Sequence, residues 1–145
     1  RFQFKGEVNG VTVIDDYGHH PTEIMATVDA AKQVGGRIVV AFKPLRYART
    51  FFFLEEFGKA FEDVDEIIVT QIYSPAGDSM HDQVNVHKLI DVIERVTGRP
   101  VRYCETTAEA VDYLVSIVKP GDLVITQGAG DIWDVGEQLL SRLDN

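Results

Sequence analysis

The stretch VTVIDDYGHHPTEI, residues 11–24, passes from a β-rich run into the first turn of a helix. Val13 and Ile14 favour a strand because β-branched side chains fit the pleated surface of a sheet. After a polar segment, Pro21 suits the first position of a helix and Glu23 suits the third. The stretch therefore predicts a strand, a polar loop and a helix, the unit from which open α/β sheets are built.

The residues on either side extend this alternation. Towards the N-terminus, Phe2 and Phe4 alternate with polar residues, and Asn9-Gly10 favours a tight hairpin turn. Towards the C-terminus, strands are expected at 37–42, 66–71, 101–104 and 123–127, and helices at 51–62, 86–96, 108–118 and 132–143. We expect residues 1–145 to form one Rossmann-like, three-layer α/β domain. Its sheet would be mostly parallel, with about six strands, an N-terminal β-hairpin at one edge and helices on both faces.

The composition limits the classes of protein to which the chain can belong. The 145 residues are 45% hydrophobic and 26% charged, which provides enough apolar material for a core. No uncharged apolar run approaches the roughly 20 residues of a membrane-spanning helix. The single cysteine, Cys104, cannot form an internal disulfide. We therefore expect a cytoplasmic protein without membrane insertion.

Charge is distributed unevenly along the chain, whose formal net charge is −9. Residues 1–50 carry seven Lys and Arg against five Asp and Glu, whereas residues 51–145 carry seven against eighteen. Because an acidic domain repels a phosphate backbone, nucleic acid is not an expected partner. Lys43, Arg46 and Arg49 are spaced three apart and suit a carboxylate or a phosphate, with a solvated basic loop as the alternative.

Polar segments follow the expected strands at the edge where open parallel sheets bind ligands. These segments are 15–21, 43–49, 72–85 and 127–132. Asp15 and Asp16 suit ribose hydroxyls or a hydrated Mg²⁺, or else complement the dipole of the following helix. His19 and His20 suit proton transfer, or else one caps the helix and the other is solvated. Adjacent histidines rarely share a metal ion, so no metal site is expected.

The glycines at 128–130 could offer backbone N–H groups to an anion, or form only a tight turn. The phenylalanines at 51–53, 57 and 61, together with Trp133, are expected to pack in the core or between helices. The chain has no Gly-x-x-x-x-Gly-Lys-Ser/Thr motif, so it cannot hold a triphosphate through a P-loop.

Several of these segments together resemble the C-terminal domain of the Mur ligases. The matching segments are RFQ at 1–3, KGE at 5–7, VIDDYGHHPTEI at 13–24, RYART at 46–50 and GAGDI at 128–132. DDYGHHPTE is the most specific of them. The resemblance implies an ATP-dependent, amide-bond-forming ligase of peptidoglycan synthesis. Its UDP-sugar domain and its P-loop ATPase domain would lie outside these residues, and this domain alone would be inactive.

The resemblance also implies a reaction and a site. ATP phosphorylates the carboxylate of UDP-N-acetylmuramate, and the amino group of L-alanine then displaces phosphate from the acyl phosphate. The implied cofactors are ATP and Mg²⁺, bound mainly by the central domain. The implied nucleotide-binding residues are Arg1 and Asp16, the amino-acid-binding residues Tyr17, His19, Arg46 and Arg49, and the substrate-loop residues Gly128 and Gly130.

The chain departs from the family pattern beside the expected amino-acid site. The usual Phe-Gln-Pro-His-Arg-Tyr reads FKPLRY at 42–47, so Lys43 replaces an amide and Leu45 replaces an imidazole. One alternative is therefore the recycling ligase, which adds a preformed peptide to UDP-N-acetylmuramate. An alternative of another class is a non-enzymatic, receiver-like signalling or nucleotide-binding module. The strand at 66–71 lacks the terminal aspartate that a receiver phosphorylates.

Overall fold

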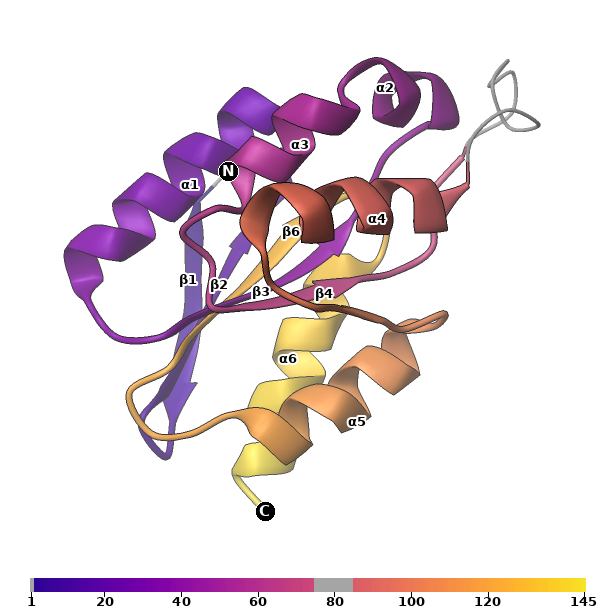
Figure 1. The fold of residues 1–145 in the computed structure, drawn as a ribbon. Helices are drawn as coiled ribbons and strands as arrows, with labels where there is room; N and C mark the ends of the chain where they lie inside the picture. Colours follow the sequence, from indigo (N-terminus) through magenta and orange to yellow (C-terminus); the bar gives the residue numbers. More distant parts are fainter. Residues whose placement is uncertain (1, 75–84) are drawn as a thin grey trace.

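Six strands form one sheet in the computed structural model, which describes residues 2–74 and 85–145 (Figure 1). The strands are β1 (Gln3–Val8), β2 (Val11–Asp16), β3 (Ile38–Lys43), β4 (Glu66–Val69), β5 (Val101–Tyr103) and β6 (Leu123–Gly128). The helices are α1 (Pro21–Val34), α2 (Tyr47–Phe52), α3 (Leu54–Ala60), α4 (Val86–Thr97), α5 (Thr107–Ile117) and α6 (Ile132–Leu143).

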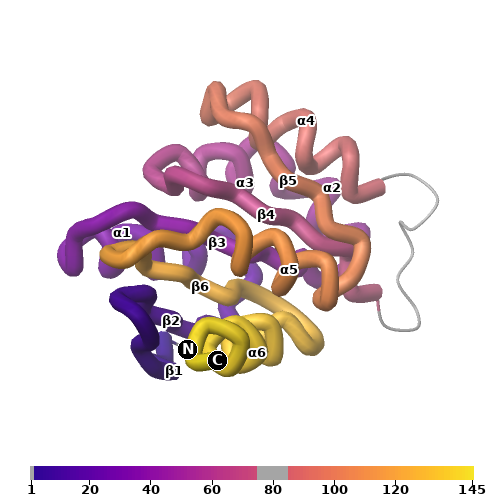
Figure 2. Tube along the Cα trace, turned by 90° about the horizontal axis from the view of Figure 1, so that it is seen from below, coloured from indigo at the N-terminus to yellow at the C-terminus, as the bar shows by residue number. Residues whose placement is uncertain are grey.

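The strand order is β1-β2-β6-β3-β4-β5, which can be followed in Figure 2. The β1–β2 pair is antiparallel and all other neighbours are parallel. Asn9 and Gly10 turn the hairpin with φ of 53° and 81°, the pair of positive angles that an Asn-Gly turn supplies. The structure confirms the predicted fold class, including the antiparallel edge.

Helices cover both faces of the sheet (Figure 1). On one face, apolar side chains of α1, α3 and α4 pack on the sheet in a core that includes Ile24, Phe57 and Leu89. On the other face, α5 and α6 contribute a second core that includes Leu114 and Leu139. None of the helices in the described ranges is long and apolar enough to cross a membrane.

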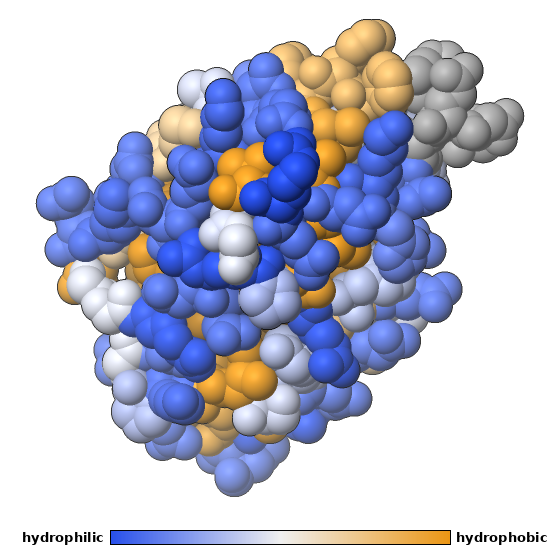
Figure 3. Space-filling view, in the orientation of Figure 1, coloured by the Kyte–Doolittle hydropathy of each residue, from blue (hydrophilic) through white to orange (hydrophobic). Residues whose placement is uncertain are grey.

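The helix predicted at 51–62 is wrong in its bounds, because the structure has two shorter helices there. Phe53 leaves helical geometry, with φ of −118° and ψ of 25°, and separates α2 from α3. Phe57 and Phe61 are buried as expected. Phe52 instead is 69% exposed, and Figure 3 shows hydrophobic side chains gathered over α2 at the upper right. Trp133, also expected to pack, is 46% exposed.

One position in the sheet order determines where the site can form. β6 is the last strand along the chain, yet it lies between β2 and β3. The helix that follows β6 packs on one face, whereas the helices that follow β2 and β3 pack on the other. Neighbouring strands whose connections leave to opposite faces open a crevice at their carboxyl ends. The carboxyl end of β6 therefore lies at the centre of the expected binding edge.

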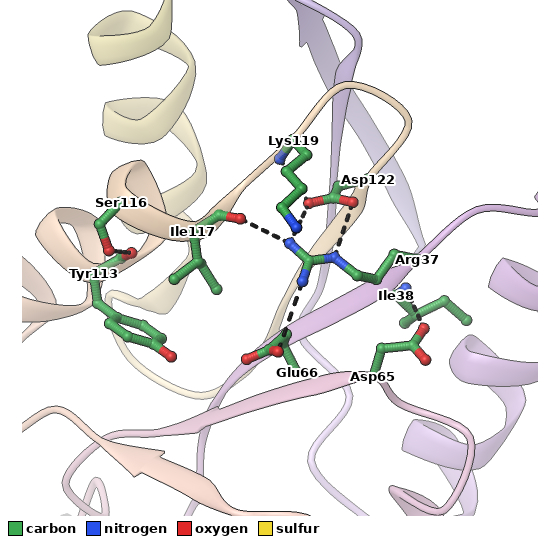
Figure 4. Close-up of polar contacts among 9 residues, drawn as sticks. All are labelled: Arg37, Ile38, Asp65, Glu66, Tyr113, Ser116, Ile117, Lys119 and Asp122. Atoms are coloured by element: carbon green, nitrogen blue, oxygen red, sulfur yellow. Dashed lines mark hydrogen bonds and ion pairs between the residues drawn. The ribbon is translucent and has the colours of Figure 1, made fainter.

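Arg37 lies directly before β3 and binds Asp122, which lies directly before β6, so it links the amino ends of these two strands (Figure 4). Its Nε and Nη2 donate to the two carboxylate oxygens of Asp122 over 3.1 and 2.8 Å, and Nη2 also donates to the Ile117 carbonyl oxygen over 2.8 Å. Burial alone would raise the pKa of Asp122. Hydrogen bonds from Arg37 and from the Lys119 backbone N–H outweigh burial and hold the pKa below its usual value.

We predict that Arg37→Met lowers the free energy of unfolding by about 2 kcal/mol, because it removes a charged hydrogen-bond donor from a buried carboxylate. The Asp122 side chain is only 5% exposed. Arg142→Met is the matched control, since the Arg142–Asp112 pair is 49% and 71% exposed and should contribute about 0.5 kcal/mol or less. Urea unfolding of both variants measures the difference.

The same pair predicts how this difference depends on pH. Because the pKa of folded Asp122 lies below 3.8, its contribution to stability is complete above that value and disappears as the pH falls through the folded pKa. The gap between the wild type and Arg37→Met should therefore narrow in acid. Equal losses in both variants at neutral pH, or a gap that widens in acid, would contradict this assignment.

Candidate functional site

Asp16 closes β2 and anchors the loop that leads into α1. Its side chain is 7% exposed. One carboxylate oxygen accepts a hydrogen bond from the Gly18 backbone N–H over 2.8 Å, and the other accepts one from the Thr27 hydroxyl. A strand end, a loop and a helix are thereby joined through one carboxylate. Asp16 also lines a pocket of about 330 Å³, whose other lining residues are Phe2, Tyr17, Glu23, Ala26, Thr27 and Ala30.

The two histidines of this loop have different surroundings. His20 caps α1, because its Nδ1 accepts a hydrogen bond from the Thr22 backbone N–H over 3.1 Å. A carboxylate oxygen of Glu23 accepts from the backbone N–H groups of His20 and His19 over 3.0 and 3.1 Å. The hydrogen bond from the His20 N–H has the larger effect, and together the two bonds lower the pKa of Glu23 below its usual value. His20 and Glu23 thus form a capping box, with histidine in the place of serine or threonine, which agrees with the alternative in which one histidine caps the helix.

His19 and Tyr17 take no part in that cap through their rings. The Nδ1 of His19 lies 3.3 Å from the Tyr17 carbonyl oxygen, and the Tyr17 side chain is 55% exposed. The family resemblance assigns both residues to the amino-acid site, and in the structure Tyr17 lines the same pocket as Asp16. The loop therefore presents a phenol and an imidazole from a backbone that Asp16 and Glu23 hold in place.

The loop after β6 packs tightly against the end of β3. Gly128 has φ of 112°, and a Cβ there would lie 2.3 Å from the Lys43 carbonyl oxygen, so no other residue fits without a shift of backbone. The Ala129 backbone N–H donates to that same oxygen over 3.0 Å. Gly130, with φ of 62°, lies 3.5 Å from side-chain atoms of Lys43 and Tyr73, measured from the position of an added Cβ.

The ammonium group of Lys43 forms an ion pair with this loop. Its Nζ lies 2.8 Å from a carboxylate oxygen of Asp131, and this hydrogen bond lowers the pKa of Asp131 below its usual value. The sequence grouped Lys43 with Arg46 and Arg49 as three cations available to an anion. In the structure Lys43 is already paired, so the two arginines are the better candidates for an anionic ligand.

Arg46 occupies an unusual backbone conformation at the start of α2. Its φ of 65° and ψ of 136° lie outside the regions that non-glycine residues favour. Its backbone N–H donates to the Tyr73 carbonyl oxygen over 2.8 Å, and its own carbonyl oxygen accepts from the Thr50 hydroxyl over 2.8 Å. Such conformations cost free energy and cluster at functional sites. The exposed Arg46 and the half-buried Arg49 therefore lie on a backbone that is held in a strained shape.

The structure brings some of the expected site residues together and separates others. Asp16, Tyr17 and His19 belong to the loop after β2, whereas Arg46 and Arg49 follow β3, and β6 with Gly128 lies between these strands. Arg1 lies outside the described residues, as does the part of the 72–85 loop from 75 to 84. Within the described ranges, no three His, Cys, Asp or Glu side chains come together as a metal site.

Sequence reasoning missed Gln127. This fully buried side chain lies between Asp16 and Phe42 in the sheet register, and its Nε2 donates to the Gly18 carbonyl oxygen over 2.7 Å. The available signal was an amide at the end of an apolar strand, directly before a glycine loop. Nothing local in the sequence shows that this amide reaches the loop after β2.

Comparison with known proteins shows which family the chain is similar to. Residues 1–130 match the family described as Mur ligase, glutamate ligase domain. The UDP-N-acetylmuramate–L-alanine ligase of Pelotomaculum thermopropionicum is 53% identical over 99% of this chain, and that of Geotalea uraniireducens is 52% identical over 99%. The chain spans only 31% of the length of each of these relatives.

Solved structures share the fold. The UDP-N-acetylmuramate-alanine ligase of Thermotoga maritima is 28% identical and superposes with a TM-score of 0.73, covering 92% of this chain and 27% of that one. The murein peptide ligase of Psychrobacter arcticus, at 22% identity and a TM-score of 0.72, covers 99% of this chain and 29% of that one and shows the fold alone. Together with the family match over most of its length, this places the chain among the Mur ligases, as a member of their glutamate ligase domain family.

Proposed function

We propose that this chain is the amino-acid-delivering C-terminal domain of an ATP-dependent ligase that joins L-alanine to UDP-N-acetylmuramate in peptidoglycan synthesis. The observation that supports this most strongly is the identity of 53% with an L-alanine ligase over 99% of the chain. The other domains of the same enzyme would bind the UDP-sugar and carry the P-loop, and the enzyme would work in the cytoplasm, where ATP and the UDP-sugar are available.

In the proposed reaction, the γ-phosphoryl group of ATP is transferred to the muramoyl carboxylate. The amino nitrogen of L-alanine then attacks the acyl carbon, the new amide bond forms, and inorganic phosphate leaves. Both steps depend on positioning and on stabilisation of negative charge. This domain would contribute the positioning of the amino acid and part of the nucleotide site.

The nucleotide side fits the pocket beside Asp16. The pocket combines one carboxylate with the aromatic ring of Phe2 and the small side chains of Ala26 and Ala30. Carboxylates accept hydrogen bonds from ribose hydroxyls, and aromatic rings pack against a planar base. Arg1 is proposed to approach the phosphates from the start of the chain. Mg²⁺ would be held mainly by the ATPase domain.

The amino-acid side fits the region at the end of β3. Arg46 and Arg49 would hold the carboxylate of L-alanine, since a guanidinium binds a carboxylate through paired hydrogen bonds. Tyr17 and His19 would border the pocket from the loop after β2. The loop that contains Gly128 and Gly130 would form its floor, where the Lys43–Asp131 pair fixes the loop against β3.

The direct test is phosphate release by the full-length ligase that carries this domain, with ATP, Mg²⁺, UDP-N-acetylmuramate and one acceptor at a time. The panel contains L-alanine, glycine, L-serine and the peptide used by recycling ligases. We expect the highest kcat/KM with L-alanine. Release with the peptide alone would replace the proposal by a recycling ligase, and release with none of these acceptors would refute the ligase assignment.

We predict that Arg49→Ala in the full-length enzyme raises the KM for L-alanine about 10- to 100-fold, because a carboxylate that loses a charged partner loses about 1.5–3 kcal/mol of binding. The KM for ATP should change much less. Arg142→Ala is the control, since it removes an arginine from an exposed ion pair on α6. An unchanged KM for L-alanine would remove Arg49 from the amino-acid site.

Asp16→Asn tests the nucleotide side of the proposed site. An amide nitrogen cannot accept the hydrogen bonds that Asp16 receives, and it removes the charge from the nucleotide pocket, so the KM for ATP should rise about tenfold. Asp15→Asn is the matched control, because Asp15 bonds to Thr126 on the other face of the sheet through an oxygen that asparagine retains. Steady-state kinetics would refute the role of Asp16 if both variants had the same KM for ATP.

A further inference from the structure

Gln127 stands at the carboxyl end of β6, directly before the Gly128 loop. In the parallel register its neighbours are Asp16 on β2 and Phe42 on β3, so these three side chains point to the face covered by α1. No part of the Gln127 side chain is exposed. Its Nε2 donates over 2.7 Å to the carbonyl oxygen of Gly18, which belongs to a different loop of the candidate site.

The other end of the same amide is not satisfied. The Oε1 of Gln127 is buried and has no hydrogen-bond partner among the described residues. A buried carbonyl oxygen without a donor costs free energy, so an apolar side chain would fill this position more cheaply. The amide is therefore poorly explained as a stabilising core residue. Its one hydrogen bond, to Gly18, is what distinguishes it from leucine.

Gly18 is held from several sides at once. Its N–H donates to Asp16 over 2.8 Å while its carbonyl oxygen accepts from Gln127. A Cβ at Gly18 would lie 2.9 Å from the Glu23 Cβ, 3.0 Å from an Asp16 oxygen and 3.4 Å from the Gln127 Nε2. The peptide between Asp16 and His19 is thus fixed by β2, α1 and β6 together, with no space for adjustment.

We propose that Gln127 is a positioning residue of the ligase, which acts by fixing the Gly18 peptide. Through Gly18 it sets the place of Asp16 on the nucleotide side and of Tyr17 and His19 on the amino-acid side. Because Gln127 directly precedes Gly128 at the end of β6, the same strand end supports both sides of the site. This inference rests on the proposed function.

The test uses Gln127→Leu and Gln127→Glu in the full-length protein. Leucine removes the donor. A protonated glutamic acid can still donate an O–H to the Gly18 carbonyl oxygen, whereas the ionised form cannot and repels both that oxygen and Asp16. Burial and the nearby Asp16 both raise the pKa of a carboxyl group at this position. Gln127→Glu should therefore recover towards wild type as the pH falls.

Thr70→Val is the matched control. Thr70 follows β4, is equally buried, and has a hydroxyl without a hydrogen-bond partner among the described residues, but it lies outside the proposed site. The titratable groups of the loop and of the start of α1 are Asp16, Tyr17, His19, His20 and Glu23. Each activity is divided by the wild-type activity at the same pH, which removes their common contribution.

For Gln127→Leu we expect the KM values for ATP and for L-alanine both to rise about tenfold at every pH. For Gln127→Glu we expect a similar loss at high pH and at least a fivefold recovery in relative kcat/KM at low pH. Thr70→Val should match the wild type. Wild-type KM values in Gln127→Leu, or no recovery of Gln127→Glu in acid, would overturn the proposal, since protonation in Gln127→Glu restores a donor to the Gly18 carbonyl oxygen.

Hydrogen exchange in the peptide 14–23 of the same proteins provides a readout independent of any acceptor. Exchange should accelerate in Gln127→Leu and, at high pH alone, in Gln127→Glu relative to wild type. If the wild type releases no phosphate with L-alanine, the proposed function fails, and this exchange pattern still decides the role of Gln127. Unchanged exchange in Gln127→Leu would then overturn it.

Discussion

The pairing of β6 with two strands at once is the constraint on which the rest of the molecule depends. All six residues of Leu123–Gly128 are buried, and they pair in parallel with Thr12–Asp16 on one side and Ile38–Lys43 on the other. A parallel strand reaches such a place only through a crossover, here α5. Because β2, β6 and β3 are parallel, the loops that follow them lie at one edge, and because the chain leaves β6 on the other face, a crevice opens between those loops.

Two different polar groups lie on the two faces of the sheet at this edge. On the α1 face, Asp16, Gly18 and Gln127 form one hydrogen-bonded group. On the α6 face, Lys43 and Asp131 hold the glycine loop against β3. Gln127 and Gly128 are consecutive residues that face opposite ways, so a single strand end supports both groups. The proposed function requires a nucleotide and an amino acid to be brought together, and under that proposal these two groups would support the site from both faces of the sheet.

Local patterns in the sequence predicted most of the fold. The Asn9-Gly10 turn, the Pro21 helix start with its Glu23 cap, and the alternation of strands and helices are short-range features, and all are present in the structure. The break at Phe53 was not predicted, because it depends on tertiary packing. Gln127 was not predicted as a site residue for the same reason, since its partner Gly18 is 109 residues away. The roles proposed for Arg46 and Arg49 came from family resemblance, because spacing alone favoured a solvated basic loop.

Under the proposed function, nucleotide and amino acid meet across the carboxyl end of β6. A crystal structure of the full-length ligase with a non-hydrolysable ATP analogue and L-alanine tests it most directly. We expect the L-alanine carboxylate within hydrogen-bond distance of Arg46 or Arg49, and the nucleoside in the pocket beside Asp16 and Phe2. L-Alanine bound away from this edge, or a nucleoside that touches neither Asp16 nor Phe2, would contradict the proposal.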